Sequence, residues 1–266
     1  MFIENYLRRK LMEIKEAVVL AAGLGTRFRG YFNEPKIFLE IKNIPLFLYP
    51  ILILKSIGVR KFNIVVNEYS YDKVEKVLRK VGDLEYCMVV NKEIWRENGY
   101  SFYLTRKCVS ENVFYVTMSD HLYTPDIPLT LSKCYSEGID IVIGGDSCPK
   151  YIDVKEATKL LFTGEKLVEI SKELAEYSHI DIGLFIVNKK IFNVAEKLAI
   201  SKDIVKFSDI LKKASQEGYS IKVCDIHGGL WTELDTIDDF KEVLEGKRSI
   251  ILKKIICYLK NKGLIK

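Results

Sequence analysis

The sequence predicts an α/β fold, built on a mainly parallel sheet with helices on both faces. Short apolar runs of strand length alternate with helix-length amphipathic segments through the first half of the chain. Such alternation favours parallel pairing through crossover helices. The 266 residues, 48% hydrophobic and 29% charged, are typical of a globular chain that can bury a full core. Ligands of such sheets bind at the carboxyl ends of the strands.

The first half supplies the alternating elements. We expect strands over 17–20, 62–66, 84–90 and 113–118, because each is an apolar run bounded by turn or polar residues. Helices are expected over 44–57, 71–81 and 101–108. Pro45 is placed to open the first of them, and Gly58 and Gly82 are placed to end the first two.

The second half is less regular. Segments 157–162 and 166–170 flank the turn residues Thr163 and Gly164 and predict a β-hairpin. Strands are expected over 139–143, 180–187 and 221–224, and helices over 190–199 and 237–244. Residues 1–14 form an expected amphipathic lead-in. We therefore expect one domain over 1–246, with an added hairpin region, and a basic amphipathic helix over 247–266.

Composition narrows the possible functions. The net charge of +5 is modest, and no dense basic stripe with interleaved aromatics is present, so nucleic acid is not an expected partner. The six cysteines form no C-x-x-C pair, and most are expected to be buried as small hydrophobic residues. Without a signal-peptide pattern or a membrane-length apolar run, the chain is expected in the cytoplasm. Its high Lys, Glu and Ile content suits a thermophile.

The most informative motif follows the first expected strand. It runs Leu20, Ala21, Ala22, Gly23, Leu24, Gly25, Thr26 and Arg27, with Pro35 and Lys36 close behind. Glycines let the backbone approach a ligand, and successive N–H groups in such a turn bind anions. The motif lacks both the third glycine of a dinucleotide fingerprint and the Gly-Lys-Ser/Thr of a P-loop. It predicts a loop for a triphosphate, with an ordinary tight turn as the alternative.

This loop resembles the signature loop of the nucleotidylyltransferases, which join an NTP to a phosphorylated sugar, polyol or alcohol and release pyrophosphate. The resemblance implies a Rossmann-like (GT-A-like) three-layer αβα fold with a mainly parallel mixed sheet. It also implies that Arg27 contacts the β/γ end of the triphosphate and that Lys36 lies near the α-phosphate. The residues implied to line the nucleotide are Leu20, Ala21, Ala22, Gly23, Gly25 and Thr26.

Two aspartates are candidate ligands for Mg²⁺, which prefers carboxylate and phosphate oxygens. Asp120 follows the expected strand 113–118. Asp235 falls in a segment that resembles the family's late W-x-[DE]-[VIL]-D-T motif, whose last Asp is the second metal ligand; Glu233 is the alternate. For both aspartates the structural alternative is a helix N-cap.

Further matches concern the acceptor and the base. Lys159, Lys172 and Asp181 fall where the family lines the acceptor pocket, although Glu156 replaces the Asp of the polyol-phosphate branch. The alternative for these three is a surface charge or a local ion pair. Asn98, Gly99 and Ser101 resemble the N-G-x-S segment that contacts base and ribose in relatives that use CTP. The alternative there is a turn in which Ser101 caps a helix.

The order and spacing of these motifs over about 16–245 resemble one branch, the inositol-1-phosphate cytidylyltransferases, which make CDP-inositol for di-inositol phosphate solutes. The resemblance implies Mg²⁺-dependent cytidylyl transfer from CTP to inositol 1-phosphate. Phosphocholine, which needs an aromatic cage, and a sugar 1-phosphate stay open as acceptors. A nucleotide-binding regulatory homologue is the non-enzyme alternative.

Some members of this branch continue into a membrane synthase, so functional coupling to such an enzyme is implied. Segment 247–266 is expected to pack on the core, with docking on a membrane enzyme or anionic lipid as the alternative. The sequence leaves CTP versus UTP and the oligomeric state undecided.

Overall fold

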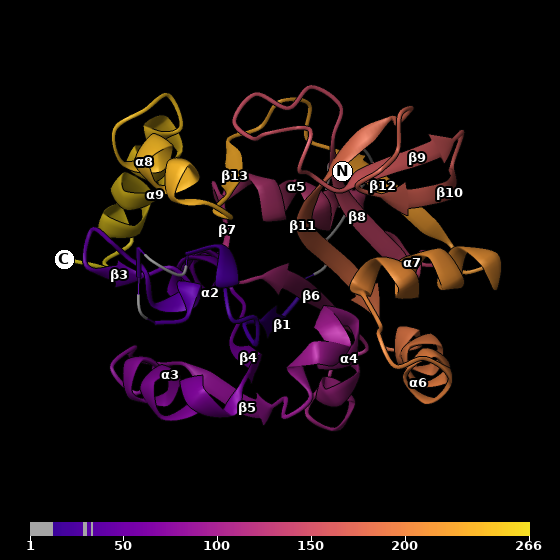
Figure 1. Cartoon of the computed structure of the whole chain (residues 1–266), viewed down its shortest axis with the longest axis horizontal. Helices are drawn as coiled ribbons and strands as arrows, with labels where there is room; N and C mark the ends of the chain where they lie inside the picture. Colours follow the sequence, from indigo (N-terminus) through magenta and orange to yellow (C-terminus); the bar gives the residue numbers. More distant parts are fainter. Residues whose placement is uncertain (1–12, 29–30, 33) are drawn as a thin grey trace, which may run out of the picture.

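The computed structural model describes residues 13–28, 31–32 and 34–266, so nearly all of the expected lead-in over 1–14 lies outside the described residues. The centre of the described structure is a nine-stranded sheet (Figure 1). Its strands are β1 (Glu16–Leu20), β4 (Lys61–Val66), β5 (Glu85–Val90), β6 (Val113–Met118), β8 (Ile141–Asp146), β9 (Lys159–Thr163), β10 (Lys166–Ser171), β11 (His179–Asn188) and β12 (Ile221–Asp225).

The sheet is parallel around β1, the strand that the glycine-rich loop follows. Strands β5, β4, β1 and β6 lie side by side and parallel, with Leu20 of β1 opposite Met118 of β6. Strand β11 then joins β6 antiparallel and carries the β9–β10 hairpin on one side and the parallel pair β8–β12 on the other. The carboxyl ends of β1 and β6 therefore meet at one rim, as the sequence predicts.

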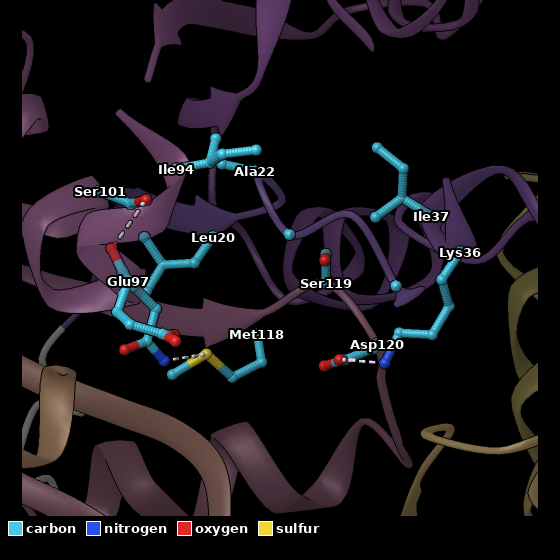
Figure 2. A pocket seen from close by; sticks show the side chains of 13 residues that line it. Leu20, Ala22, Lys36, Ile37, Ile94, Glu97, Ser101, Met118, Ser119 and Asp120 are labelled. Atoms are coloured by element: carbon cyan, nitrogen blue, oxygen red, sulfur yellow. Dashed lines mark hydrogen bonds and ion pairs between the residues drawn. The ribbon is translucent and has the colours of Figure 1, made fainter. Parts of the chain in front are cut away.

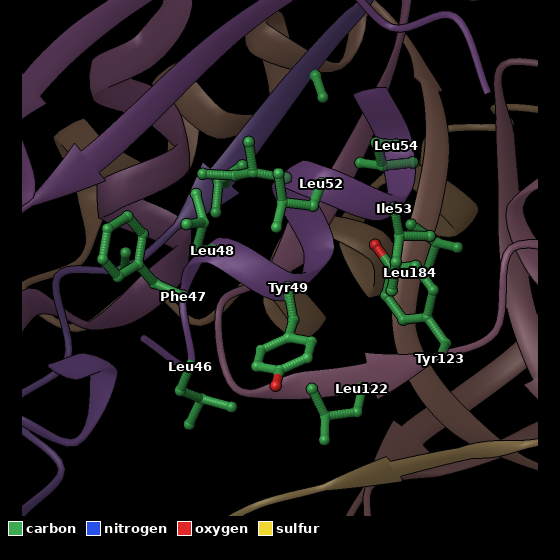
Figure 3. Close-up of a cluster of buried hydrophobic side chains, with 14 of the residues drawn as sticks. Leu46, Phe47, Leu48, Tyr49, Leu52, Ile53, Leu54, Leu122, Tyr123 and Leu184 are labelled. Carbon is green, nitrogen blue, oxygen red and sulfur yellow. The ribbon is translucent and has the colours of Figure 1, made fainter. Parts of the chain in front are cut away.

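Helices cover both faces and make three layers. The helices are α2 (Leu48–Ser56), α3 (Tyr71–Leu78), α4 (Glu97–Leu104), α5 (Asp126–Cys134), α6 (Ile191–Ser201), α7 (Phe207–Gln216), α8 (Ile237–Leu244) and α9 (Ser249–Asn261). Alternate residues of β1 point to opposite faces. Ala17 and Val19 belong to one core, together with buried residues of α2, α3, α5, α8 and α9, and Val18 and Leu20 belong to a second core with residues of α4, α6 and α7. Figure 3 shows part of the first core, where α2 lies beside Leu122, Tyr123 and Leu184. No helix of the described ranges is long and apolar enough to cross a bilayer.

The predicted fold class is confirmed, but several predicted boundaries are wrong. The first helix begins at Leu48 rather than at residue 44, because β3 (Ile44–Pro45) pairs with β2 (Glu40–Ile41) around Lys42 and Asn43, both at positive φ. Helix α4 begins at Glu97, so Ser101 lies inside the helix and is not its N-cap. Helices α5 and α7 and the short pair β7 (His121–Tyr123) and β13 (Trp231–Glu233) were not predicted.

The cysteines also differ from the expectation of buried small side chains. Cys134 of α5 and Cys224 of β12 form a disulfide, and Cys148 and Cys257 are exposed. The disulfide joins α5 to β12, on which the helix also packs.

Glu16, at the start of β1, is a buried carboxylate with several donors. It accepts hydrogen bonds from the backbone N–H groups of Ser110 (2.9 Å) and Glu111 (2.6 Å) and from Asn63 (2.8 Å), and Lys61 lies 3.0 Å away. Burial alone would raise the pKa of Glu16, but these donors outweigh burial and hold its pKa below the ordinary value of 4.5. The ionised carboxylate therefore ties β1 to the loop that precedes β6.

We expect Glu16→Gln to lower the free energy of unfolding at neutral pH by about 1–3 kcal/mol, because an amide turns a donor toward N–H groups that need an acceptor. A depressed pKa stabilises the fold above the unfolded-state pKa, and that stability is lost as pH falls through the folded-state pKa. Denaturant unfolding from pH 7 to pH 3 checks this. The difference between wild type and variant should shrink as the pH falls below 4.5, and a constant difference across the whole range would contradict the assignment.

Candidate active site

A cavity of about 230 Å³ opens at the carboxyl ends of β1 and β6. Figure 2 shows Lys36 and Asp120 at one end and Glu97 and Ser101 at the other. The predicted nucleotide-site residues that line it are Leu20, Ala22, Gly23, Gly25, Asn98 and Ser101. Ala21, Thr26 and Gly99 are not among its lining residues; Ala21 instead donates a backbone hydrogen bond to Val65, at 2.8 Å.

A second cavity, of about 440 Å³, adjoins the first and shares Glu97, Asn98, Met118 and Asp120 with it. Its lining contains the predicted residues Arg27, Lys172, Asp181 and Asp235. Motifs more than 200 residues apart in sequence thus meet around two connected hollows, and Asp120 lies where the hollows join.

Lys36 lies between the two aspartates. Its Nζ is 2.8 Å from Asp120 Oδ2 and 2.7 Å from Asp235 Oδ1, and its side chain is 10% exposed. Arg27 approaches the other oxygen of Asp235, at 3.0 Å. Burial alone would lower the pKa of Lys36, but the two carboxylates reverse that effect and hold its pKa above the ordinary value of 10.5. Lys36 is therefore a fixed positive charge.

The glycine-rich loop packs directly on Lys36. Gly25 has φ +61°, and a Cβ at Gly25 would overlap the Cβ of Lys36 and come within 2.9 Å of its backbone nitrogen. A residue with a side chain is strained at this φ and has no room. The second glycine of the motif is therefore needed for close approach to the lysine.

We expect Gly25→Ala to lower kcat by roughly 10²-fold, because displacement of Lys36 by about 1 Å is enough to misalign the reacting groups. Gly23→Ala is the matched control, since a Cβ at Gly23 meets no protein atom within 4 Å. It should leave kcat nearly unchanged and raise the KM for the nucleotide that this loop is predicted to bind. Steady-state kinetics of both variants test this, and equal kcat values for both would contradict it.

Asp120 is held on its other side by His121. The imidazole Nδ1 lies 2.8 Å from Asp120 Oδ1, and Nε2 lies 3.6 Å from Glu233 Oε2. The ring stacks on Trp231, with centroids 6.2 Å apart and planes at 9°. A Cβ at Gly183 would lie 2.6 Å from the ring, so only glycine leaves space for it.

The charges of this group follow from its contacts. Burial alone would lower the pKa of His121, but Asp120 and Glu233 raise it to about 9. Burial would likewise raise the pKa of Asp120, yet Lys36 and His121 hold it well below its usual range. Burial raises the pKa of Glu233 to about 7. Asp120 is therefore ionised at neutral pH, between two cations.

Neither metal candidate serves as a helix cap. Asp120 lies in the turn between β6 and β7. Helix α8 is capped by Thr236, which accepts from the Asp239 N–H, while Asp239 accepts from the backbone of Asp235 and Thr236. The capping alternative is thus wrong for both, and the Asp235 side chain points to Lys36 and Arg27 instead.

The donor set fits Mg²⁺. Asp120 and Asp235 turn carboxylate oxygens toward one point, where Lys36 Nζ contacts both. Such hard oxygens suit Mg²⁺, which proteins commonly hold with one or two carboxylates plus substrate phosphates. In the part of the chain that the structure describes, no three His, Cys, Asp or Glu side chains are grouped to hold a metal unaided. The remaining ligands would have to come from substrate and water.

Asn98 lines both cavities, and its segment packs against the start of α7. Asn98 Oδ1 accepts from the Phe207 N–H at 2.8 Å, and the Gly99 N–H donates to Val205 at 2.8 Å. A Cβ at Gly99 would lie 2.5 Å from the Lys206 carbonyl oxygen. Gly99 therefore permits close packing of α4 on the start of α7 and does not line the first cavity.

The two predicted acceptor lysines lie in different places. Lys172 lines the second cavity, whereas Lys159 lines neither. The buried Lys159 ammonium donates to the backbone carbonyl of Lys172 and, at 3.4 Å, to that of Lys155. Asp181 accepts from the Gly183 N–H at 2.8 Å, and burial raises its pKa to about 6.

The second cavity is also lined by Lys206, Phe207 and Ser208, from a segment in which no site residue was predicted. They begin α7, whose buried residues Phe207, Ile210, Leu211 and Ala214 have helical spacing. That spacing is a signal for the helix. It carries no information about the cavity, because only the contact with α4 brings these residues there.

Comparisons with known proteins identify the family and the fold. The family model described as nucleotidyl transferase matches residues 16–249. The bifunctional IPC transferase and DIPP synthase of Thermococcus kodakarensis is 32% identical over 85% of this chain and 49% of its own length. Its namesake from Aquifex aeolicus is 31% identical over 86% of this chain and 51% of its own. The chain spans about half the length of these curated relatives.

A solved structure is similar over nearly the whole chain. The inositol-1-phosphate CTP transferase from T. maritima is 32% identical, with a TM-score of 0.82, over 91% of this chain and 96% of that one. The three-layer fold is therefore that of nucleotidyltransferases.

Proposed function

The chain belongs to the nucleotidyl transferase family, and we propose that it transfers the cytidylyl group of CTP to inositol 1-phosphate, giving CDP-inositol and pyrophosphate. The observation that carries the proposal is Lys36, held between Asp120 and Asp235 where two cavities join. Such a junction suits two anionic substrates that must meet. The names of the relatives, IPC transferase and inositol-1-phosphate CTP transferase, support this pair of substrates.

The chain's own residues provide charge neutralisation and positioning. The acceptor phosphate attacks the α-phosphorus of CTP in line, and because it is already anionic, no general base is needed. Lys36 neutralises the α-phosphate, and Arg27 with the loop N–H groups holds the leaving pyrophosphate. Lys172 and Lys206, both at the second cavity, attract the acceptor phosphate. Asp120 and Asp235 would hold Mg²⁺, which supplies further positive charge at the phosphates when bound.

The second cavity favours a polyol over phosphocholine. A quaternary ammonium group is recognised by an aromatic cage. Phe207 is the one Phe, Tyr or Trp among the described residues that line this cavity. Asp181 and Glu233 instead offer carboxylate oxygens, which accept hydrogen bonds from hydroxyl groups.

We expect Asp181→Asn to raise the KM for inositol 1-phosphate by roughly 10-fold, the value of a hydrogen bond to a charged group. In the wild type this KM should rise as pH falls through about 6, because protonation of Asp181 removes its charge. The acceptor phosphate titrates in the same range. The comparison with Asp181→Asn isolates the carboxyl group, and identical pH profiles for the two proteins would contradict its role.

The acceptor assignment is tested by pyrophosphate release with CTP or UTP against inositol 1-phosphate, phosphocholine, glucose 1-phosphate and glucosamine 1-phosphate. We expect release with CTP and inositol 1-phosphate. Release with another acceptor would support the proposed nucleotidyl transfer but contradict inositol 1-phosphate as the acceptor. No release with any pair would favour a nucleotide-binding regulatory protein. Since the curated relatives are also named DIPP synthases, we further propose that such a synthase consumes the product.

A further inference from the structure

Positive charge is concentrated in the last twenty residues. Residues 247–266 contain seven Lys and Arg and no Asp or Glu, whereas the whole chain carries a formal charge of only +5. The other 246 residues therefore hold a slight excess of acidic side chains. A surface that carries only positive charge, on a protein whose other charges nearly cancel, attracts negatively charged partners.

The charge lies on the outer side of α9. The inner side buries Ile251, Leu252, Ile255 and Leu259 in the core. Three exposed lysines, Lys253, Lys254 and Lys260, lie on the outer side together with Ile250 and Cys257, and we name these three the lysine stripe. Lys253 and Lys260 are seven residues apart, which places them on one face of the helix, and Lys254 follows Lys253 at the edge of that face. Figure 1 shows α9 at one end of the molecule, near the C-terminus.

The lysine stripe has no acidic partner among the residues that the structure describes. Over residues 13–28, 31–32 and 34–266, no carboxylate forms an ion pair with Lys253, Lys254 or Lys260. Arg248, in contrast, is buried and bonds to Asp239 at 2.7 Å. The fold thus uses Arg248 for its own packing and leaves the lysines to the solvent.

The end of α9 extends this basic surface. A cavity of about 310 Å³ lies there, and its lining contains three cationic residues, Lys55, Arg60 and Lys262, against one acidic residue, Asp83. Lys262 is exposed and follows the stripe directly along the chain. An anionic group that approaches the stripe therefore meets further cations at its carboxyl end.

We propose that the outer face of α9 docks on an anionic phospholipid surface, with the helix lying along that surface. Lysines on a surface helix attract acidic lipid headgroups in this way. Ile250, 41% exposed on the same face, adds a small apolar contact. The stripe contains no aromatic residue to stack on bases, which disfavours nucleic acid. The proposal is independent of the acceptor and nucleotide assignments.

The test is co-sedimentation of the full chain with vesicles of phosphatidylglycerol and phosphatidylcholine in equal parts, and with vesicles of phosphatidylcholine alone. The variant is Lys253→Gln/Lys254→Gln/Lys260→Gln. The matched control, Lys107→Gln/Lys133→Gln/Lys222→Gln, removes the same charge from exposed lysines on other elements. Thermal unfolding of both variants establishes that they fold.

The wild type should bind the acidic vesicles, and high salt should weaken this binding. The stripe variant should bind them on the order of 100-fold more weakly, from about fivefold per lysine, and the control should lose little. Equal binding to neutral vesicles, no binding to acidic vesicles, or equal losses in both variants would overturn the proposal. Tighter binding to a short duplex DNA, lost in the stripe variant, would assign the face to nucleic acid instead.

Discussion

Lys36→Ala should lower kcat by about 10²–10³-fold, the cost of removing one strong electrostatic stabiliser from a transition state. Lys36 is the buried cation at the junction of the two cavities, 2.8 Å and 2.7 Å from two carboxylates. A positive charge that stabilises the pentacoordinate transition state at the α-phosphorus more than the bound substrate acts mainly on kcat. Steady-state kinetics with CTP varied at saturating acceptor measure the effect.

The control for this prediction is Lys36→Arg, which keeps the charge but changes its shape and reach. It should retain more activity than Lys36→Ala. A raised KM for CTP with an unchanged kcat in Lys36→Ala would show that Lys36 binds the ground state and transition state equally. That result would remove it from the catalytic role proposed here.

Asp120→Asn should lower kcat by roughly 10²-fold or more, because the amide loses the negative charge that a cation at the phosphates requires. Asp120 contacts Lys36 and His121 through separate oxygens, at 2.8 Å each. The side chain has nearly the same shape after substitution, so thermal unfolding should change less than activity.

Glu233→Gln is the comparison for Asp120→Asn. Glu233 approaches His121 at 3.6 Å and does not touch Lys36, so its loss should cost less in kcat than the loss of Asp120. Near-normal turnover of Asp120→Asn at saturating Mg²⁺ would exclude Asp120 as an essential metal ligand. A larger loss in Glu233→Gln would make Glu233, the alternate from the motif, the better candidate.

The sequence predicted the parts of the site that local patterns encode. The loop from Leu20 to Arg27 and the aspartate after strand 113–118 could be located because apolar runs and glycines mark strand ends. Parallel strands then bring the loop and Asp120 to one rim, whereas Asp235 was placed there only by its resemblance to a family motif. The ion pairs of Lys36 with both aspartates were not predicted.

The parts of the fold and the site that were not predicted depend on contacts between segments far apart in the sequence. Lys206 and Phe207 reach the second cavity because Gly99 lets α4 pack on the start of α7. No sequence pattern near residue 206 predicts this contact. Lys159 matched a family segment, yet the fold directs its ammonium to the Lys172 carbonyl. Ile44 and Pro45 suggested a helix start, but they form β3, which pairs with β2. In each case tertiary packing overrides the local signal.

The central claim is that this chain joins CTP and inositol 1-phosphate directly at the Lys36 junction. The most direct test is to incubate the wild type with both substrates and Mg²⁺ and to quantify CDP-inositol and pyrophosphate together, with a matched reaction in EDTA. We predict equal amounts of the two products with Mg²⁺ and neither in EDTA. Absence of CDP-inositol with Mg²⁺, or pyrophosphate formed without it, would contradict the account.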